Sequence, residues 1–243
     1  MSLIKKLLKV AGKDELQLDS RIGKKYLFGL CLKYGGMMLR GKWFSLGNSR
    51  IHKNVFVGKK VKILEKRYLT IGEKTKIHDG VYIDALSREG VLLGNQVVVG
   101  RNTRIECTGS LSRIGKGVRI GDRSTFGNDC FFGAAGGISI GADVVAGQFI
   151  RFHSENHNFN DQNLLIREQG VTSKGIKVGN NCWIGSGAVF LDGVEVGDGC
   201  VIAANAVVTR SFPANSIIAG IPAKRIRNRG HSYGHDFDNH PSI

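Results

Sequence analysis

A six-residue period of apolar side chains constrains the fold of this chain more than any other feature. From Ile176 onward the sequence divides without interruption into IKVGNN, CWIGSG, AVFLDG, VEVGDG, CVIAAN and AVVTRS. The third position of these hexads is apolar throughout: Val178, Ile184, Phe190, Val196, Ile202 and Val208. The first position is also apolar or small: Ile176, Cys182, Ala188, Val194, Cys200 and Ala206. A period of six fits neither an α-helix nor a long strand, but it fits a short strand followed by a turn.

The same period runs through the upstream half in shorter sets, separated by slips of a few residues. The sets are Ile51, Val57, Ile63; Ile71, Ile77, Ile83; Leu93, Val99, Ile105; Ile114, Ile120, Phe126, Phe132; and Ile140, Ala146, Phe152. Three strand–turn units close a triangular coil, so the chain stacks on itself after about 18 residues. The pattern therefore predicts an all-β solenoid of about seven coils, with the third-position side chains inside. Cys182 and Cys200 fall one coil apart and are interpreted as stacked core residues rather than a disulfide or zinc site.

Composition supports many tight turns in an ordered chain. Glycine is abundant, at 34 of 243 residues, whereas there are only 3 prolines. The five cysteines form no CxxC pair, which favours reduced thiols and a cytoplasmic location. We recognise no signal peptide and no apolar run of the roughly 18 residues that a membrane span needs. The net charge of +15 suits nucleic acid, an anionic membrane surface or an anionic small molecule, and does not choose among them.

We expect three parts: a basic, partly helical N-terminal cap (1–46), the solenoid (47–210) and a C-terminal cap with a polar tail (211–243). Residues 3–13 form a basic amphipathic pattern, interpreted as a capping or packing helix in preference to docking on anionic lipid. The hexads stop after Phe152 and resume at Ile176, which predicts a polar active-site loop over 153–175, since so long an interruption is usually functional. The three histidines of the tail are expected to be exposed.

The stretch from Trp183 to Arg227 resembles the C-terminal half of hexapeptide-repeat acetyltransferases. The segments WIGSGA and AGIPAK carry the resemblance, and the hexads extend it from about Ile51 to Arg227. The closest pattern is that of galactoside, maltose and surface-polysaccharide O-acetyltransferases. The resemblance implies a left-handed parallel β-helix, a homotrimer, acetyl-CoA as co-substrate without a metal, and a sugar or glycan acceptor in polysaccharide or lipopolysaccharide biosynthesis. A peripheral place at the inner membrane face would suit a lipid-linked acceptor.

In that family a histidine lies in the loop before the last block of coils, and His157 in SENHNF matches its position. An imidazole titrates near neutral pH, so it can take the proton from an attacking sugar hydroxyl and return it to the leaving thiolate. This direct transfer needs no cysteine nucleophile. His153 is a candidate acceptor ligand, although a structural role is an equal alternative. His78, at a position otherwise held by a corner glycine, is interpreted as a plain corner residue.

The resemblance also assigns the donor side of the site. The backbone N–H of Ser186 is expected to stabilise the developing oxyanion. Small corner residues would let the pantetheine arm approach, and cations would meet the phosphates. The implied cofactor-binding residues are Trp183, Ser186, Ala204, Thr209, Arg210, Lys224 and Arg227. Asn128 in FGND lies near the family's sugar-binding asparagine, with a one-residue slip, and the acidic partner of that family is replaced here by GAAGG.

Two other functions remain open on the same fold. A γ-class carbonic anhydrase needs three zinc-binding histidines between subunits, and the spacing of His78, His153 and His157 does not match that set. A non-catalytic module binding an anionic glycan or nucleic acid would use the positive charge. We find no aromatic ladder, zinc knuckle or helix-turn-helix pattern, so nucleic acid is the less favoured partner.

Overall fold

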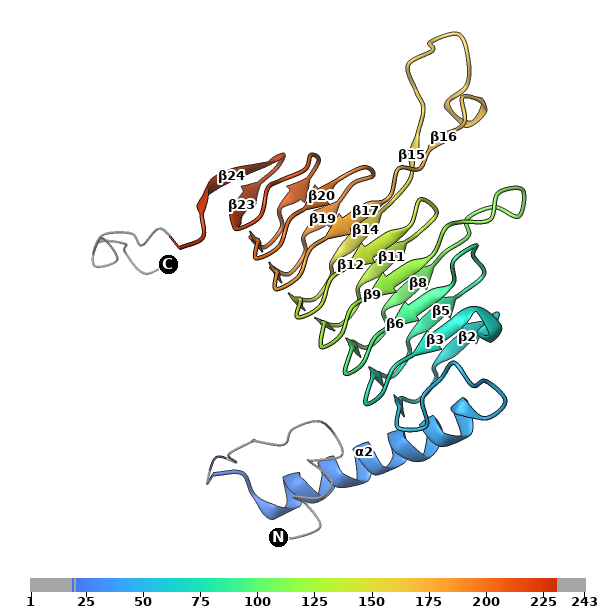
Figure 1. Ribbon diagram of the computed structural model, residues 1–243, viewed down its shortest axis with the longest axis vertical. Coiled ribbons are helices and arrows are strands. Elements are labelled where there is room, and N and C mark those ends of the chain that lie inside the picture. The colour runs from blue at the N-terminus through green and yellow to red at the C-terminus, as the bar shows by residue number, and fades with distance from the viewer. Residues whose placement is uncertain (1–18, 20, 231–243) are drawn as a thin grey trace.

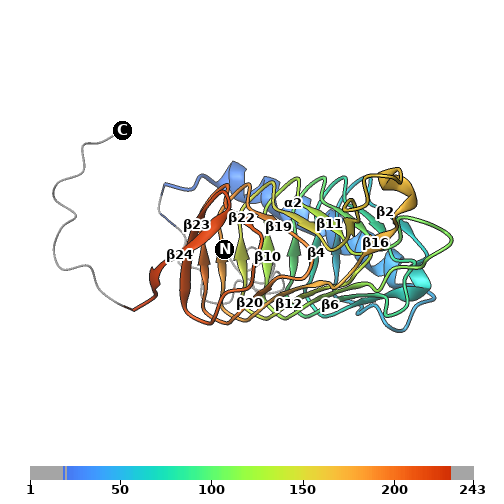
Figure 2. The same cartoon turned by 90° about the horizontal axis from the view of Figure 1, so that it is seen from above.

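The chain passes through three β-sheets in a fixed order, once in each coil. The computed structural model describes Asp19 and residues 21–230. In each coil a strand of sheet 1 is followed by one of sheet 2 and then one of sheet 3. Each strand pairs in parallel with its counterparts in the neighbouring coils, except at the hairpins described below. The sheets are the three sides of a coiled column (Figures 1 and 2).

The strands are short, as the hexads predict. Sheet 1 contains β1 (Phe56–Val57), β4 (Lys76–Ile77), β7 (Val98–Val99), β10 (Thr125–Phe126), β13 (Val145–Ala146), β18 (Trp183–Ile184), β21 (Val201–Ile202), β23 (Ser216–Gly220) and β24 (Ala223–Asn228). Sheet 2 contains β2 (Lys62–Leu64), β5 (Tyr82–Asp84), β8 (Arg104–Glu106), β11 (Phe131–Gly133), β14 (Arg151–His153), β19 (Val189–Phe190) and β22 (Val207–Val208). Sheet 3 contains β3 (Leu69–Ile71), β6 (Val91–Leu93), β9 (Val118–Ile120), β12 (Ile138–Ile140), β17 (Ile176–Val178) and β20 (Glu195–Val196).

The predicted third positions fill the inside of the column. All of them are buried except Ile63, which is half-buried, and Ile114, whose side chain is 41% exposed. The prediction was wrong at Ile114 because the chain leaves the coil between β8 and β9, where an isolated bridge joins Ser110 and Arg113. Cys182 and Cys200 are buried free thiols one coil apart, since β18 pairs with β21.

A second, longer excursion separates β14 from β17. It contains β15 (Asn156–His157), which pairs antiparallel with β16 (Val171–Thr172), and a 3-10 turn, η2 (Ile166–Glu168). The hairpin projects away from the column (Figure 1). The Gln169 amide ties its outer part together, because Nε2 donates to the carbonyl oxygens of Asp161 (2.8 Å) and Leu164 (3.0 Å).

A long helix, α2 (Lys24–Ser45), lies across the N-terminal end of the column (Figure 1). Met37 and Gly41 are its buried residues, and Met37 packs with Phe56 of β1. A Cβ at position 41 would lie 1.8 Å from the carbonyl oxygen of Val55, so only glycine permits this approach. Arg40 Nε donates to the carbonyl oxygens of Val57 (2.9 Å) and Gly58 (3.1 Å).

The C-terminal end of the column carries β24, which pairs antiparallel with β23.

In the first coil, at the N-terminal end, a second 3-10 turn, η1 (Lys66–Tyr68), precedes β3. No helix within residues 21–230 is long and apolar enough to cross a membrane. The helix expected over residues 3–13 and the histidines of the C-terminal tail lie outside the described residues.

Candidate active site

The corner between sheets 1 and 2 brings several of the predicted residues into one column. The parallel pairing of β10, β13, β18 and β21 aligns Asn128, Gln148, Ser186 and Ala204 in successive coils. Asn128 Oδ1 accepts a hydrogen bond from the backbone N–H of Arg101 (2.9 Å), one coil earlier. Ser186 Oγ accepts one from the N–H of Gln148 (3.2 Å). A corner side chain thus accepts from the backbone of the preceding coil.

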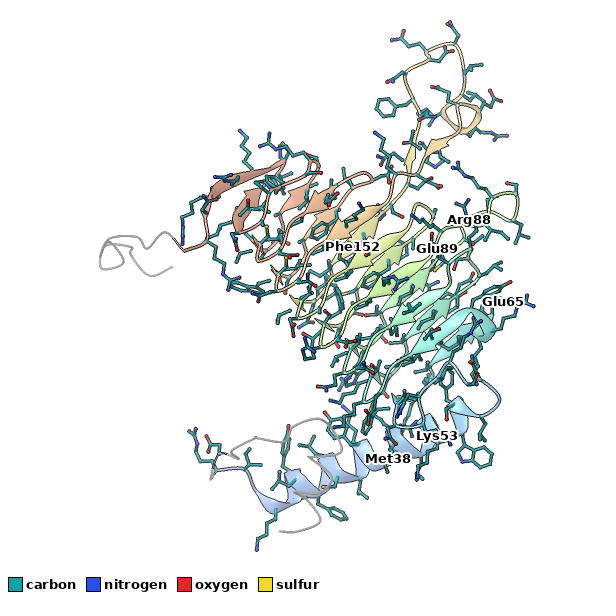
Figure 3. The ribbon with its side chains drawn as sticks, in the orientation of Figure 1. Met38, Lys53, Glu65, Arg88, Glu89 and Phe152 are labelled. Carbon is teal, nitrogen blue, oxygen red and sulfur yellow. The ribbon has the colours of Figure 1, made fainter. Side chains whose placement is uncertain are left out.

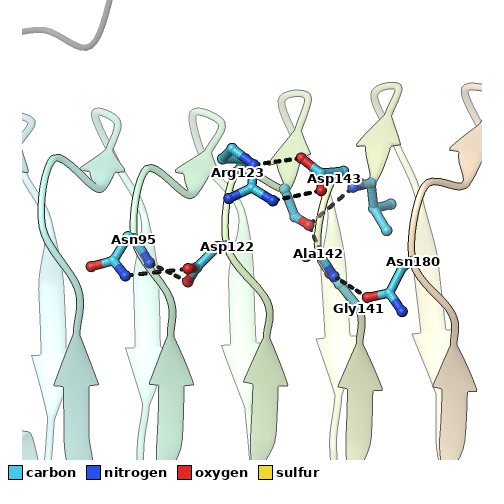
Figure 4. Close-up of polar contacts among 9 residues, drawn as sticks. Asn95, Asp122, Arg123, Gly141, Ala142, Asp143 and Asn180 are labelled. Carbon is cyan, nitrogen blue, oxygen red and sulfur yellow. Dashed lines mark hydrogen bonds and ion pairs between the residues drawn. The ribbon is translucent and has the colours of Figure 1, made fainter.

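The same rule holds at the corner between sheets 3 and 1 (Figure 4). There Asp122 Oδ1 accepts from the N–H of Asn95 (2.8 Å), and Asn180 Oδ1 accepts from the N–H of Ala142 (2.9 Å). The ladder is broken wherever the next coil has alanine at the corner, because a methyl group accepts no hydrogen bond.

Ser186 lies at such a break, since Ala204 follows it one coil later. Within residues 21–230 nothing accepts a hydrogen bond from the Ser186 N–H, and Ser186 is exposed. Gly147 of the preceding coil lies close beneath, where a Cβ would come within 2.7 Å of Ser186 N. The corner therefore presents a backbone donor that an outside acceptor can reach.

Trp183, Lys224 and Arg227 belong to the same side of the column. Trp183 on β18 is 60% exposed on the outer face of sheet 1. Lys224 and Arg227 lie on β24, where they pair in register with Ala219 and Ile217 of β23 at the C-terminal end of that sheet. The Lys224 side chain is exposed, and Arg227 Nη1 donates to the carbonyl oxygen of Asn228 (3.2 Å). Five of the seven donor-binding candidates thus share one sheet and its corner: Trp183, Ser186, Ala204, Lys224 and Arg227.

The opposite edge of sheet 2 holds the other candidates. His157 lies at the base of the projecting hairpin, opposite Val171, and is exposed. Thr209 and Arg210 follow β22 at the same edge, and the Arg210 guanidinium lies 5.5 Å from the centre of the Phe212 ring. Within one chain, His157 and Ser186 therefore occupy corners on either side of sheet 2, and the structure does not bring them together.

His153, at the end of β14, is half-buried beside Phe131, with ring centres 5.6 Å apart. Burial lowers the pKa of His153 below the ordinary value of histidine, and the positive charge of Arg151 lowers it further. The side chain is therefore held more firmly in its neutral form.

Four of the five cysteines are buried free thiols: Cys107, Cys130, Cys182 and Cys200. Burial raises the pKa of the Cys107 thiol to about 12 and that of Cys130 to about 11. A hydrogen bond with Cys200, together with burial, raises the pKa of Cys182. Cys107, Cys130 and Cys182 are therefore poor nucleophiles, since the thiolate is the reactive form, whereas the same hydrogen bond lowers the pKa of the buried Cys200 to about 7.

Sequence reasoning missed two features of this surface. One is the corner ladder, whose signal was the recurrence of Asn, Asp and Ser directly after the corner glycine. The other is a groove of about 350 Å³ on the outside of sheet 3, lined by charged residues. Its charged lining is Glu89, Lys116, Arg119, Lys174, Lys177 and Glu195. In residues 21–230 no three His, Cys, Asp or Glu side chains gather closely enough to hold a metal ion.

The fold and the repeats define a three-sided parallel β-helix built from hexapeptides. Residues 175–210 match the family described as bacterial transferase hexapeptide (six repeats). A probable acetyltransferase of Mycobacterium tuberculosis is 30% identical over 161 residues, which are 59% of this chain and 54% of that protein. The galactoside O-acetyltransferase of Escherichia coli is 26% identical over 208 residues, which are 85% of this chain and 86% of that enzyme.

A solved structure shows the same fold. A variant of an N-acyltransferase from Bacillus cereus, crystallised with dTDP and coenzyme A, has a TM-score of 0.51 at 17% identity. The match covers 73% of this chain and 82% of that one. The similarity to hexapeptide-repeat acetyltransferases predicted from WIGSGA and AGIPAK is confirmed. The chain spans about half the length of the first curated relatives that it matches.

Proposed function

We propose that this protein is an O-acetyltransferase that moves the acetyl group of acetyl-CoA to a sugar hydroxyl. The unpaired Ser186 N–H carries the proposal, because it is an exposed, fixed donor of the kind that stabilises a thioester oxyanion. Trp183 lies on β18, the strand that leads through Gly185 to Ser186, so its exposed ring is close to this donor in the chain. Lys224 and Arg227 on the same sheet supply positive charge for the phosphates of coenzyme A.

In this mechanism His157 acts as general base. It takes the proton of the sugar hydroxyl as the oxygen attacks the thioester carbonyl, and it returns that proton to the leaving thiolate. The negative charge that develops on the carbonyl oxygen is stabilised by the Ser186 N–H. Ala204, Thr209 and Arg210 would line the path of the pantetheine arm, and the small side chain of Ala204 permits close approach there. No cysteine takes part.

The positions of His157 and Ser186 call for more than one subunit. They occupy opposite edges of sheet 2, so a single reaction that uses both must combine edges of two neighbouring chains. A closed ring of three chains, each offering both edges, satisfies this requirement with identical contacts. A homotrimer with the site between subunits is therefore part of the proposal, as is the left-handed sense of the coil.

The acceptor is proposed to be a sugar of surface polysaccharide or lipopolysaccharide biosynthesis. A putative lipopolysaccharide O-acetyltransferase of Escherichia coli is among the relatives, at 28% identity over 101 residues. Asn128 lies in the Ser186 column. Its Oδ1 already accepts a hydrogen bond from the N–H of Arg101, so its Nδ2 is the atom that can donate to a hydroxyl of the sugar. His153 would accept or donate as a neutral imidazole. The cytoplasm, where coenzyme A thioesters are available, is the proposed location.

Replacing either of two corner alanines by asparagine tests the role of the Ser186 N–H. An asparagine at position 204 should accept a hydrogen bond from that N–H, as Asn180 accepts one from the N–H of Ala142. We expect Ala204→Asn to lower kcat/KM at least about 10²-fold, the effect of losing one oxyanion donor. It should also abolish the rise in melting temperature caused by acetyl-CoA.

Ala142→Asn is the matched control, because it makes the same change at the corner between sheets 3 and 1, opposite Asp122. It should leave kcat/KM and the rise in melting temperature with acetyl-CoA unchanged.

His157→Gln should lower kcat about 10²–10⁴-fold, while acetyl-CoA should still raise the melting temperature. Absence of any shift with the unaltered protein at millimolar acetyl-CoA would reject the acyltransferase and favour a binding module.

A further inference from the structure

Helix α2 exposes a continuous apolar stripe on the side away from the β-helix. Its members are 60–77% exposed: Phe28 63%, Leu32 62%, Leu39 60%, Trp43 77% and, directly after the helix, Leu46 64%. At 100° per residue these positions fall within an arc of about 60°. The buried face of α2, with Met37 and Gly41, points the other way, so the stripe is not needed to hold the helix on the column.

The charge around the stripe has one sign. Residues 21–64 contain eleven lysines and arginines and no aspartate or glutamate. By the same helical geometry, Lys24 and Lys42 flank the stripe on one side and Lys25 lies at its other margin, whereas Lys33 lies toward the column. Arg40 is held by carbonyl oxygens of the first coil, whereas Lys24, Lys25 and Lys42 are exposed.

We infer that α2 lies flat on an anionic lipid bilayer, with Phe28, Leu32, Leu39 and Trp43 in the interface and the lysines against the headgroups. An apolar stripe bordered by cations, with a tryptophan inside it, is the pattern of an interfacial helix. A contiguous exposed apolar patch rimmed by charged side chains marks an interaction surface. The helix lies at one end of the column, so the coils stand away from the bilayer (Figures 1 and 3).

A second copy of the chain is the less suitable occupant. Two such stripes packed face to face would align rows of lysine with rows of lysine, and the segment has no acidic residue to pair with them. An anionic bilayer suits both the apolar stripe and the lysines beside it, because its headgroups attract the lysines and the apolar side chains leave water. This inference does not depend on acyl transfer.

The test uses the full chain and vesicles of phosphatidylcholine with about 30% phosphatidylglycerol, an anionic surface. The protein should float with these vesicles, and less with pure phosphatidylcholine or at high salt. The variant Leu32→Ser/Trp43→Ser should bind at least roughly tenfold more weakly, because two large apolar side chains no longer leave water. Leu111→Ser, an 88% exposed leucine on a loop of the column, is the matched control and should bind like the unaltered protein.

A spectroscopic measurement places the helix directly. The chain has two tryptophans, so Trp183→Phe leaves Trp43 as the only indole. Its emission should shift to the blue on adding anionic vesicles and be quenched by brominated lipid.

Three results would overturn the inference. One is a folded protein that ignores anionic vesicles, and another is unchanged binding of the double variant, which would assign any lipid binding to residues 1–18. The third is a double variant with a smaller native mass or a lower melting temperature, because the stripe would then be covered by protein.

Discussion

At the scale of single residues, one small side chain decides whether a corner N–H is satisfied or left open. Asn, Asp and Ser at the corners accept from the preceding coil, as Asn180 does for Ala142. Ala204 cannot, so the Ser186 N–H has no acceptor among residues 21–230. Ala142 leaves the Asp122 N–H open in the same way, so it is the nearby Trp183, Lys224 and Arg227 that make the Ser186 corner the candidate oxyanion site. The eighteen-residue spacing predicts that Ser186 and Ala204 lie one coil apart, but not that the Ser186 N–H has no other acceptor.

His78 offers a prediction about pH. Burial lowers its pKa below the ordinary value, and Lys33 of α2 and Arg101 lower it further, whereas Asp79 acts in the opposite direction. In the folded state the imidazole therefore resists protonation. Below about pH 6.5 the unfolded chain takes up a proton that the folded chain does not, so folding is weakened as pH falls.

We therefore expect the melting temperature of the unaltered protein to fall between pH 7 and pH 5, and to fall less in His78→Asn. At pH 8 both states hold neutral imidazole, so any difference there reports packing alone. Thermal unfolding followed by circular dichroism at the three pH values measures this. An equal fall in both proteins would show that His78 is not the group responsible.

At the scale of elements, aromatic stacking joins the coils that carry the hairpin. Phe152 stacks on Phe132 and Phe190 with ring centres 4.9 Å and 4.8 Å apart, and all three are fully buried. These residues belong to β11, β14 and β19, the strands of sheet 2 on either side of the excursion that carries His157. The stack gives the hairpin a rigid base while its outer part remains exposed.

Phe152→Ala should lower the free energy of unfolding by about 3–5 kcal/mol, because a buried ring is lost and its cavity can close only in part. Urea unfolding monitored by circular dichroism measures the change. Phe159→Ala removes a 69% exposed ring from the hairpin and should cost less than about 0.5 kcal/mol. Similar losses in the two variants would contradict this account of the core.

At the scale of the whole molecule, the two edges of sheet 2 matter most. Ser186 and Ala204 lie at one edge, and His157 lies at the other. A single coil does not bring its two edges together, so the proposed site requires edges from two chains of the proposed trimer.

Mixed oligomers test this arrangement. His157→Gln and Ala204→Asn should each be nearly inactive alone, but a one-to-one mixture refolded together should regain about a quarter of the active sites. That fraction follows because random partners in a ring pair an intact histidine edge with an intact Ser186 edge in one site of four. Mass measurement by light scattering should give a trimer. No recovery in a mixed trimer would place the whole site within one subunit.

The sequence by itself determined the coil, the inward positions and the family resemblance. Because a period of six puts each third-position side chain on the inside of the coil, burial could be predicted from Ile51 to Val208, except at Ile114, which is exposed, and Ile63, which is half-buried. The failure at Ile114 arose because a loop can imitate the period over a few residues without joining the core. WIGSGA, AGIPAK and SENHNF likewise indicated Ser186, Lys224 and His157 as candidates.

Only the tertiary structure decided which of these residues share a surface. The eighteen-residue period places Ser186 and Ala204 one coil apart, but only the observed parallel pairing adds Asn128 to their column and separates His157 from them by a sheet. The outward stripe of α2 also required the structure, because Phe28 and Met37 look equally apolar in sequence. Which face a helix buries depends on what it packs against. Here Met37 packs against Phe56 of β1, and the opposite face remains exposed, with Phe28, Leu32, Leu39 and Trp43.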